Sequence, residues 1–178
     1  MTTVGSIETN LDKLVEEKTD GKSASFSEFY RSHQLYIRNM LFRIGIRDEL
    51  DDAVQITFVK AWTKLDKFEK RASVKTWLTR IAVNVAYERF RKLKPAPPTP
   101  PRQLQRTENR VENQQLVSRA LESLTIEHRL VVVLCLIEGH SLEEVSEITG
   151  HPVGTIKSRL HRARTTLQKT LKELGLEL

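Results

Sequence analysis

Apolar side chains recur at intervals of three and four residues in several stretches of the chain, which is the spacing of one face of an α-helix. These stretches cover residues 26–45, 47–65, 73–94, 141–150 and 152–167. No stretch of useful length shows the strict alternation of apolar and polar residues that is typical of a half-buried strand. The pattern therefore predicts an all-α protein.

A proline-rich segment separates the helical stretches into two groups. Five prolines lie between Pro95 and Pro101, and proline cannot continue the interior of a helix because it lacks the backbone N–H. We therefore predict two small helical domains joined by a flexible, extended linker. The predicted boundaries are a mobile N-terminal arm over 1–25, a first domain over 26–94, the linker over 95–115 and a second domain over 116–178.

The helix predicted after Pro152 has two contrasting faces. Its apolar stripe consists of Val153, Ile156, Leu160, Ala163 and Leu167. The remaining surface carries hydroxyl and basic groups that can donate hydrogen bonds to phosphates and base edges. We predict DNA contacts from Thr155, Lys157, Ser158, Arg159, His161, Arg162 and Arg164. The alternative is an ordinary amphipathic helix with a solvated basic face.

The preceding stretch supports the DNA-binding interpretation. Ser141 and Glu144 have the spacing of a capping box at a helix start, and Gly150 marks the helix end. Two short helices joined by a glycine-containing turn form a helix-turn-helix, whose second helix enters the major groove. Residues 116–150 contain two basic and six acidic side chains, whereas 151–178 contain six basic and two acidic ones, so positive charge gathers on the predicted reading helix.

A second basic zone lies at the end of the first domain. Residues 70–94 have a net charge of +7 in a chain whose total is +6. The helix predicted there buries Val74, Trp77, Leu78, Ile81, Ala82 and Val85. We expect its outer face to carry Thr76, Thr79, Arg80, Val83, Tyr87, Phe90 and Arg91. Aromatic rings among basic groups suit an unpaired nucleic-acid strand; alternatively, Tyr87 and Phe90 pack on another helix, and the charge serves solubility.

Other residues exclude several function classes. Asp48, Glu49, Asp51 and Asp52 gather at the start of the second helix, where carboxylates complement the helix dipole, and no nearby histidine or nucleophile completes a catalytic or metal site. Cys135 is the only cysteine and lies in an apolar run, which predicts an inert core thiol. No membrane-spanning run or secretory signal is present. We therefore expect a cytoplasmic, non-enzymatic protein with no cofactor and no metal.

Three strings resemble one family in the order in which that family has them. They are DELDDAVQITFVKAW, KTWLTRIAVN and HPVGTIKSRLHRAR, and the resemblance, which covers residues 26–174, is to extracytoplasmic-function (ECF) sigma factors. It implies a transcription initiation factor: a region 2-like domain that binds core RNA polymerase and captures the opened −10 strand, and a region 4-like domain that reads the −35 element. A core-independent helix-turn-helix regulator and a protein-interaction adaptor remain the alternatives.

The resemblance also implies roles for particular residues and partners. Contact with core polymerase falls on Asp51, Asp52 and Gln55, while Phe58 and Trp62 belong to the core. Capture of the −10 strand falls on Lys70, Arg71, Ser73, Lys75, Arg80, Asn84, Tyr87 and Arg91. The implied partners are promoter DNA, the β′ clamp and β flap of core polymerase, and an anti-sigma factor, without membrane insertion.

The chain departs from the family pattern at three positions. Ile56 replaces a usual glutamate, Val74 replaces a common aromatic residue, and Thr125 replaces the usual proline at the start of region 4. We expect the last change to be well tolerated because threonine is itself a capable N-cap. The reading face identifies no bases, so the sequence does not predict the promoter sequence.

Overall fold

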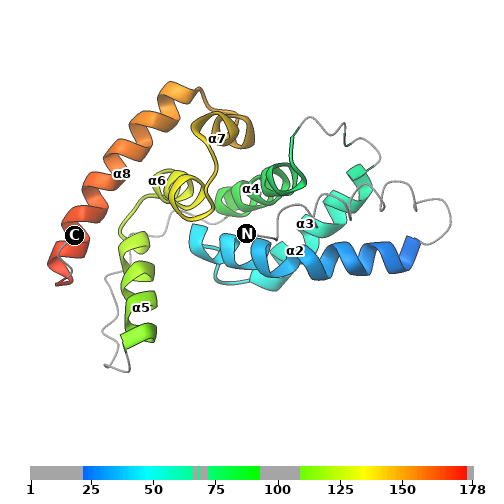
Figure 1. Cartoon of the computed structure of the whole chain (residues 1–178), viewed down its shortest axis with the longest axis horizontal. Coiled ribbons are helices and arrows are strands. Elements are labelled where there is room, and N and C mark those ends of the chain that lie inside the picture. The colour runs from blue at the N-terminus through cyan, green and yellow to red at the C-terminus, as the bar shows by residue number, and fades with distance from the viewer. Residues whose placement is uncertain (1–21, 66–67, 69–71, 93–108, 176–178) are drawn as a thin grey trace, which may run out of the picture. The chain divides into compact units, whose positions relative to one another are not determined.

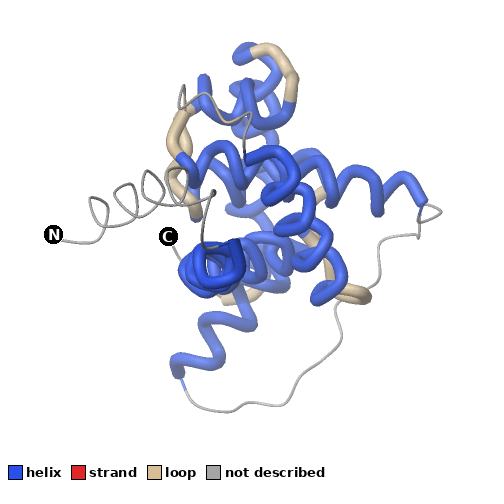
Figure 2. Tube along the Cα trace, turned by 90° about the vertical axis from the view of Figure 1, so that its right-hand side faces the viewer, coloured by secondary structure: helices blue, strands red, loops and turns tan. Residues whose placement is uncertain are grey.

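The computed structural model describes residues 22–65, 68, 72–92 and 109–175. Regular structure in these residues is helical throughout, as Figure 2 shows, which confirms the all-α prediction. The elements are α2 (Lys22–Ile44), α3 (Leu50–Lys64), α4 (Val74–Lys92), α5 (Asn109–Glu122), α6 (Ile126–Val132), the π-helical turn η3 (Val133–Ile137), α7 (Leu142–Thr149) and α8 (Val153–Glu173) (Figure 1).

The chain forms two compact units. Among the described residues, the first unit lies within 22–42 and 46–89, and the second lies within 43–45 and 90–175. Two helices begin earlier than expected: α2 starts at Lys22, within the predicted arm, and α5 starts at Asn109, within the predicted linker. Residues 109–115 follow the last proline of the linker and contain none themselves, so nothing prevents a helix there. The rest of the arm and of the linker lies outside the described residues.

The core of the first unit is built around aromatic side chains. Phe29 of α2 and Phe58 of α3 are both 1% exposed, and their ring centroids lie 5.6 Å apart in an edge-to-face arrangement. Tyr30 also packs edge-on against Phe58, with centroids 4.8 Å apart. Such pairs add to the stability gained from apolar burial. Phe58 is thus a core residue, as predicted, whereas Trp62 is half-buried.

Helix α4 is fixed to the other two helices by polar contacts. The Tyr36 hydroxyl of α2 lies 2.8 Å from Thr79 Oγ1, and Lys60 Nζ of α3 lies 2.8 Å from a Glu88 carboxylate oxygen.

Gly45 ends α2 with a φ of 118°, and the Ile46 N–H donates to the Leu41 carbonyl at 3.0 Å. Only glycine adopts this φ readily, which confirms Gly45 as the predicted helix stop.

The burial of His33 predicts that the first unit loses stability in acid. Its side chain is buried, Nδ1 donates to the Phe29 carbonyl at 3.0 Å, and Nε2 has no partner among the described residues. Burial lowers the pKa of His33 below its ordinary value of 6.5. Below pH 6.5 the unfolded chain therefore binds a proton that the folded unit excludes, so stability falls as the pH drops, by at most about 1.4 kcal/mol per pH unit.

This acid sensitivity can be measured in the first unit alone, because both tryptophans, Trp62 and Trp77, lie there. Urea unfolding followed by tryptophan fluorescence should show a loss of stability between pH 7 and pH 5.5. His33→Leu should remove most of this dependence, whereas His161→Gln on α8 should retain it. An unchanged pH dependence in His33→Leu would contradict the assignment.

The second unit packs around α8, which contacts α5, α6 and α7. Its fully buried side chains include Leu130, Leu134 and Ile156. Thr125 directly precedes α6, and its side-chain oxygen accepts from the His128 N–H at 3.4 Å. Threonine thus acts as the N-cap here, as predicted from its replacement of proline.

Arg129 closes the end of α5. Its Nε donates to the Leu121 carbonyl at 2.7 Å, and one terminal nitrogen donates to the carbonyls of Glu122 and Leu124, each at 3.1 Å. The last carbonyls of a helix have no partner within it, so this guanidinium satisfies them and also joins α5 to α6.

The apolar run that contains Cys135 is less buried than its composition predicts. The run changes from α-helical to π-helical at Val133, and Leu136 and Ile137 are 46% and 37% exposed. Cys135 is half-buried, which corrects the prediction of a core position. Its partial burial raises the pKa of the thiol, an effect that nearby Arg164 opposes.

Candidate nucleic-acid interface

Local hydrogen bonds fix both ends of α7 and the turn that leads from it into α8. Ser141 Oγ accepts from the Glu144 N–H at 3.1 Å, and a Glu144 carboxylate oxygen accepts from the Ser141 N–H at 2.9 Å. Gly150 ends α7 with a left-handed φ of 73°. Ser146 Oγ then donates to the His151 carbonyl at 2.7 Å. These contacts confirm the predicted helix-turn-helix and set the direction in which α8 begins (Figure 1).

One face of α8 is buried against the rest of its unit. Ile156 and Ala163 are fully buried and Leu160 is 9% exposed, as the apolar stripe predicted. Val153 departs from this prediction because it is 37% exposed. It lies at the first position of the helix, before the turns that hold the buried stripe.

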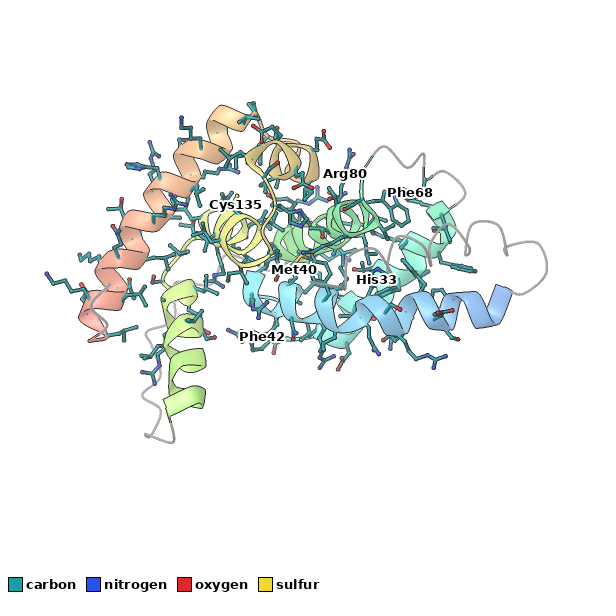
Figure 3. All side chains as sticks on the ribbon, in the orientation of Figure 1. His33, Met40, Phe42, Phe68, Arg80 and Cys135 are labelled. Carbon is teal, nitrogen blue, oxygen red and sulfur yellow. The ribbon has the colours of Figure 1, made fainter. Side chains whose placement is uncertain are left out.

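The opposite face of α8 presents the predicted DNA-binding groups to solvent. Lys157, Ser158, His161, Arg162 and Arg164 are exposed, while Thr155 and Arg159 are half-buried. Ser158 Oγ donates to the Thr155 carbonyl at 3.0 Å. Within the described part of the chain, the four basic side chains Lys157, Arg159, Arg162 and Arg164 form no ion pair. Side chains project from the length of this helix in Figure 3, so the surface can meet an extended polyanion.

Helix α4 carries a narrower exposed stripe than the sequence predicted. Arg80, Asn84 and Arg91 are exposed, and at 100° per residue they follow one line along the helix. Tyr87 and Phe90 lie beside this line and are half-buried. These five side chains, which we call the α4 stripe, combine donors, an amide and aromatic edges.

Three residues expected on the outer face of α4 are buried. Thr76, Thr79 and Val83 are 4%, 0% and 0% exposed, so the prediction that they face outward was wrong. The prediction was based on a single apolar stripe along the helix. In the structure, neighbouring elements bury a larger part of the circumference of α4. A threonine is tolerated in such a place when its hydroxyl is hydrogen-bonded, as Thr79 is to Tyr36.

Two residues predicted to bind DNA, Ser73 and Lys75, make contacts within the protein at the start of α4. Ser73 Oγ accepts from the Thr76 N–H at 3.1 Å and lies 2.9 Å from Thr76 Oγ1, which is the contact of an N-cap. Lys75 Nζ lies 4.8 Å from the centre of the Tyr36 ring. Because Lys75 and Asn84 are nine residues apart, they occupy opposite sides of the helix.

The loop before α4 is described only in part. Phe68 packs against Trp77 of α4, with ring centroids 5.0 Å apart. In Figure 3 Phe68 and Arg80 are labelled toward the same end of α4. The predicted strand contacts Lys70 and Arg71 lie outside the described residues. The contact between Phe68 and Trp77 therefore joins Phe68 to the first turn of α4.

The beginning of α3 presents an acidic surface. Asp51, Asp52 and Gln55 are exposed, and Val59, one turn further along, is 59% exposed. Asp48 and Glu49 precede the helix, which begins at Leu50, so only two of the four predicted carboxylates belong to its first turn. Asp51 pairs with Arg38 of α2, and Arg89 of α4 pairs with both Glu49 and Asp52.

Comparison with known proteins matches both units to one family. Residues 29–95 match the model of sigma-70 region 2, and residues 114–167 match that of sigma-70 region 4. The ECF RNA polymerase sigma factor SigW of Bacillus subtilis is 30% identical over 187 aligned residues, which cover 94% of this chain and 100% of the relative. The chain belongs to the ECF sigma factors.

Other relatives and solved structures agree with this membership. The sigma-E factor of Escherichia coli K12 is 30% identical over 179 residues, covering 90% of this chain and 94% of the relative. The sigma factor RpoE of Bartonella quintana, solved with the anti-sigma factor NepR, is 30% identical with a TM-score of 0.67, covering 83% and 96% of the two chains. CnrH, solved with the cytosolic domain of CnrY, is 26% identical with a TM-score of 0.68, covering 92% and 98%.

The sigma factor is thus a transcription initiation factor that directs polymerase to promoters. A core-independent helix-turn-helix regulator is not favoured, because the match includes region 2 as well as region 4. The residues that the structure describes contain no helix long and apolar enough to cross a membrane. They also contain no group of three or more His, Cys, Asp or Glu side chains placed to hold a metal.

Sequence reasoning missed Arg89 and the ion pair between Lys60 and Glu88. Both connect α3 with α4 in the sigma factor. Arg89 belongs to a run of basic residues, and the sequence alone does not distinguish its role from that of the others. Only the helix geometry separates it from exposed Arg91, since two residues along a helix turn the side chain through about 200°.

Proposed function

We propose that this sigma factor binds core polymerase through α3 and then contacts a promoter at two places. Helix α8 reads the −35 element as duplex DNA, and the α4 stripe holds the opened −10 strand. The observation that carries this proposal is the exposed basic and hydroxyl face of α8, the second helix of the helix-turn-helix. The domain boundaries that go with it are region 2 over 26–94 and region 4 over 116–178.

Reading of the −35 element follows from the chemistry of the α8 face. An arginine can donate two hydrogen bonds to the O6 and N7 atoms of guanine in the major groove, and serine or histidine can contact several bases. Lysine and the remaining arginines contact phosphates and fix the register of the helix. We assign base contact to Ser158, His161 and Arg162, which lie near the centre of the exposed face, and phosphate contact to Lys157, Arg159 and Arg164, with Thr155 at the half-buried start of the same face.

Capture of the −10 strand follows from the α4 stripe. The Asn84 amide offers both a donor and an acceptor to the edge of an unpaired base, while Arg80 and Arg91 follow the phosphates. The half-buried ring of Tyr87 provides a surface for stacking. Unpairing and extruding a base costs a few kcal/mol, and these contacts together with Lys70 and Arg71 offset that cost. Ser73 then acts mainly by capping α4, and Lys75 acts from the opposite side of the helix.

Binding to core polymerase follows from the acidic start of α3. Asp51, Asp52 and Gln55, with exposed Val59 beside them, combine charge, an amide and an apolar contact on one surface. We propose that this surface binds the β′ clamp and that region 4 contacts the β flap. Because polymerase then holds both DNA-binding surfaces, the second promoter contact becomes intramolecular, which raises the overall affinity by about 10²–10⁴.

Control by an anti-sigma factor is part of the same proposal. RpoE and CnrH share this fold and were solved with proteins bound to them, NepR, an anti-sigma factor, in the first case and CnrY in the second. We propose that a comparable protein holds this sigma factor inactive. The proposed place of action is the cytoplasm, where polymerase meets promoters, and the proposed action is binding without catalysis or a cofactor.

The proposal predicts that DNA binding depends on core polymerase. Genomic fragments are first selected with the reconstituted holoenzyme, and their affinity is then measured for the sigma factor with and without core. We expect the free sigma factor to bind at least about 100-fold more weakly than the holoenzyme. Equal affinity of both for the selected fragments would contradict the proposal and would favour a core-independent regulator.

A further inference from the structure

Arg89 does not belong to the DNA-facing side of α4. Its side chain is only 12% exposed, whereas Arg91, two residues further along the helix, is exposed. The two terminal nitrogens of its guanidinium pair with Glu49 and Asp52, and its Nε is buried without a partner among the described residues. A buried cation requires compensating charge, and these two carboxylates provide it.

Glu49, which pairs with Arg89, also has an unusual backbone conformation at the start of α3. Glu49 is the N-cap residue of α3, but its side chain makes no capping hydrogen bond. It adopts a left-handed φ of 56°, which is unfavourable for a residue with a Cβ atom. Its carboxylate pairs with Arg89 instead. This ion pair connects the residue before α3 to helix α4.

The carboxylates of the first turn of α3 are thereby fixed but still accessible. Asp52 pairs with Arg89 and Asp51 pairs with Arg38, yet the side chains of Asp52 and Asp51 remain 58% and 74% exposed. Arg38 is itself 46% exposed, compared with 12% for Arg89. Exposed ion pairs contribute little because water screens them, so Arg89 is the stronger of the two constraints.

We propose that Arg89 is a positioning residue for the binding of core polymerase. It fixes the orientation of the Asp52 carboxylate and of Glu49 before α3. In this orientation Asp52 would contact a basic surface of the polymerase clamp. A side chain that is already ordered loses less conformational freedom on binding, which favours the complex. This inference rests on the proposed role of Asp52 in core binding and deepens it.

The ion pair between Lys60 and Glu88 provides a matched control. It joins the same two helices, with Lys60 Nζ 2.8 Å from the Glu88 carboxylate, but it lies two turns further along α3. Lys60→Met therefore removes a link between α3 and α4 without releasing Asp52. A purely structural role for Arg89 would give the two variants similar effects on polymerase binding.

The test is a double-mutant cycle between Arg89→Met and Asp52→Asn, in which the Kd for core polymerase is measured with the full chain. We expect each single variant to bind about fivefold more weakly, the equivalent of roughly 1 kcal/mol, and the double variant to bind no more weakly than Asp52→Asn alone. Arg89→Lys should retain most of the affinity, and Lys60→Met should stay within about twofold of wild type.

The possible outcomes separate the inference from the proposed function. If Arg89→Met does not fold, the cycle is run with Arg89→Lys, whose smaller loss should vanish when Asp52 is already asparagine. Multiplicative losses in the double variant, or an equal loss from Lys60→Met, would overturn the inference while leaving core binding intact. A wild-type chain that does not bind core would instead overturn the proposed function, and the inference with it.

Discussion

Replacing Arg162 by alanine should reduce initiation at a selected promoter by about tenfold or more, because one bidentate contact with a base is worth about 1–3 kcal/mol. Arg162 is exposed on the outer face of α8, and it lies away from the buried residues Ile156 and Ala163. Its removal therefore leaves the fold of region 4 intact. The measurement is run-off transcription with reconstituted holoenzyme at matched occupancy of core.

Lys172→Ala is the control for Arg162→Ala. Lys172 is also basic and exposed, but it lies in the last turn of α8, far from the proposed reading surface. It should change initiation by less than about twofold, since it removes one charge and no base contact. Both variants should bind core polymerase as wild type does. An equal loss in the two variants would show that α8 supplies only general positive charge.

The second large effect is expected at Asn84. Asn84→Ala should impair initiation about tenfold on duplex promoters, because the amide offsets part of the cost of a few kcal/mol for opening and extruding a base. A template that is already unpaired across the −10 element removes most of that cost. The loss on such a template should therefore be much smaller. Run-off transcription on the two templates, made from one promoter sequence, provides the comparison.

Two further variants test whether the effect of Asn84 belongs to strand capture. Arg80→Ala removes another member of the α4 stripe and should show the same preference for the pre-opened template. Thr63→Ala, at an exposed polar position on α3, should initiate normally on both templates. Equal losses on duplex and pre-opened templates for Asn84→Ala would contradict strand capture and would indicate a defect in folding or in core binding.

Much of the helix-turn-helix could be predicted because its signals are local. The capping box joins Ser141 to Glu144, three residues later, and the left-handed conformation at the end of α7 depends on Gly150 itself. The buried positions Ile156, Leu160 and Ala163 follow from helical spacing alone. Such features need no knowledge of what packs against the helix, so the sequence predicts both the motif and its reading face.

The surroundings of α4 could not be predicted in the same way. Burial of Thr79 depends on Tyr36, which lies 43 positions earlier in the chain, and the burial of Val83 depends on a packing arc wider than one stripe. The exposure of Val153 likewise follows from where the packing against α8 begins. In each case the decisive contact is tertiary, and a pattern of apolar and polar positions along one helix does not contain it.

Arg89 illustrates the same limit for charged residues. The sequence shows basic residues at positions 89, 91 and 92 without indicating which of them is exposed. Only the structure shows that Arg89 turns toward the carboxylates at the start of α3. The sequence therefore pointed to Asp51 and Asp52 as candidate contacts, but it did not point to the arginines that hold these carboxylates.

The proposed two-point contact with the promoter is tested most directly by run-off transcription with purified core polymerase on a promoter selected by the holoenzyme. Templates carry both elements, only the −35 element, or only the −10 element. We expect a specific transcript only when the sigma factor, core polymerase and both elements are present together. Efficient specific transcription from either single-element template, or no specific transcript from the complete promoter, would contradict the proposed two-point contact.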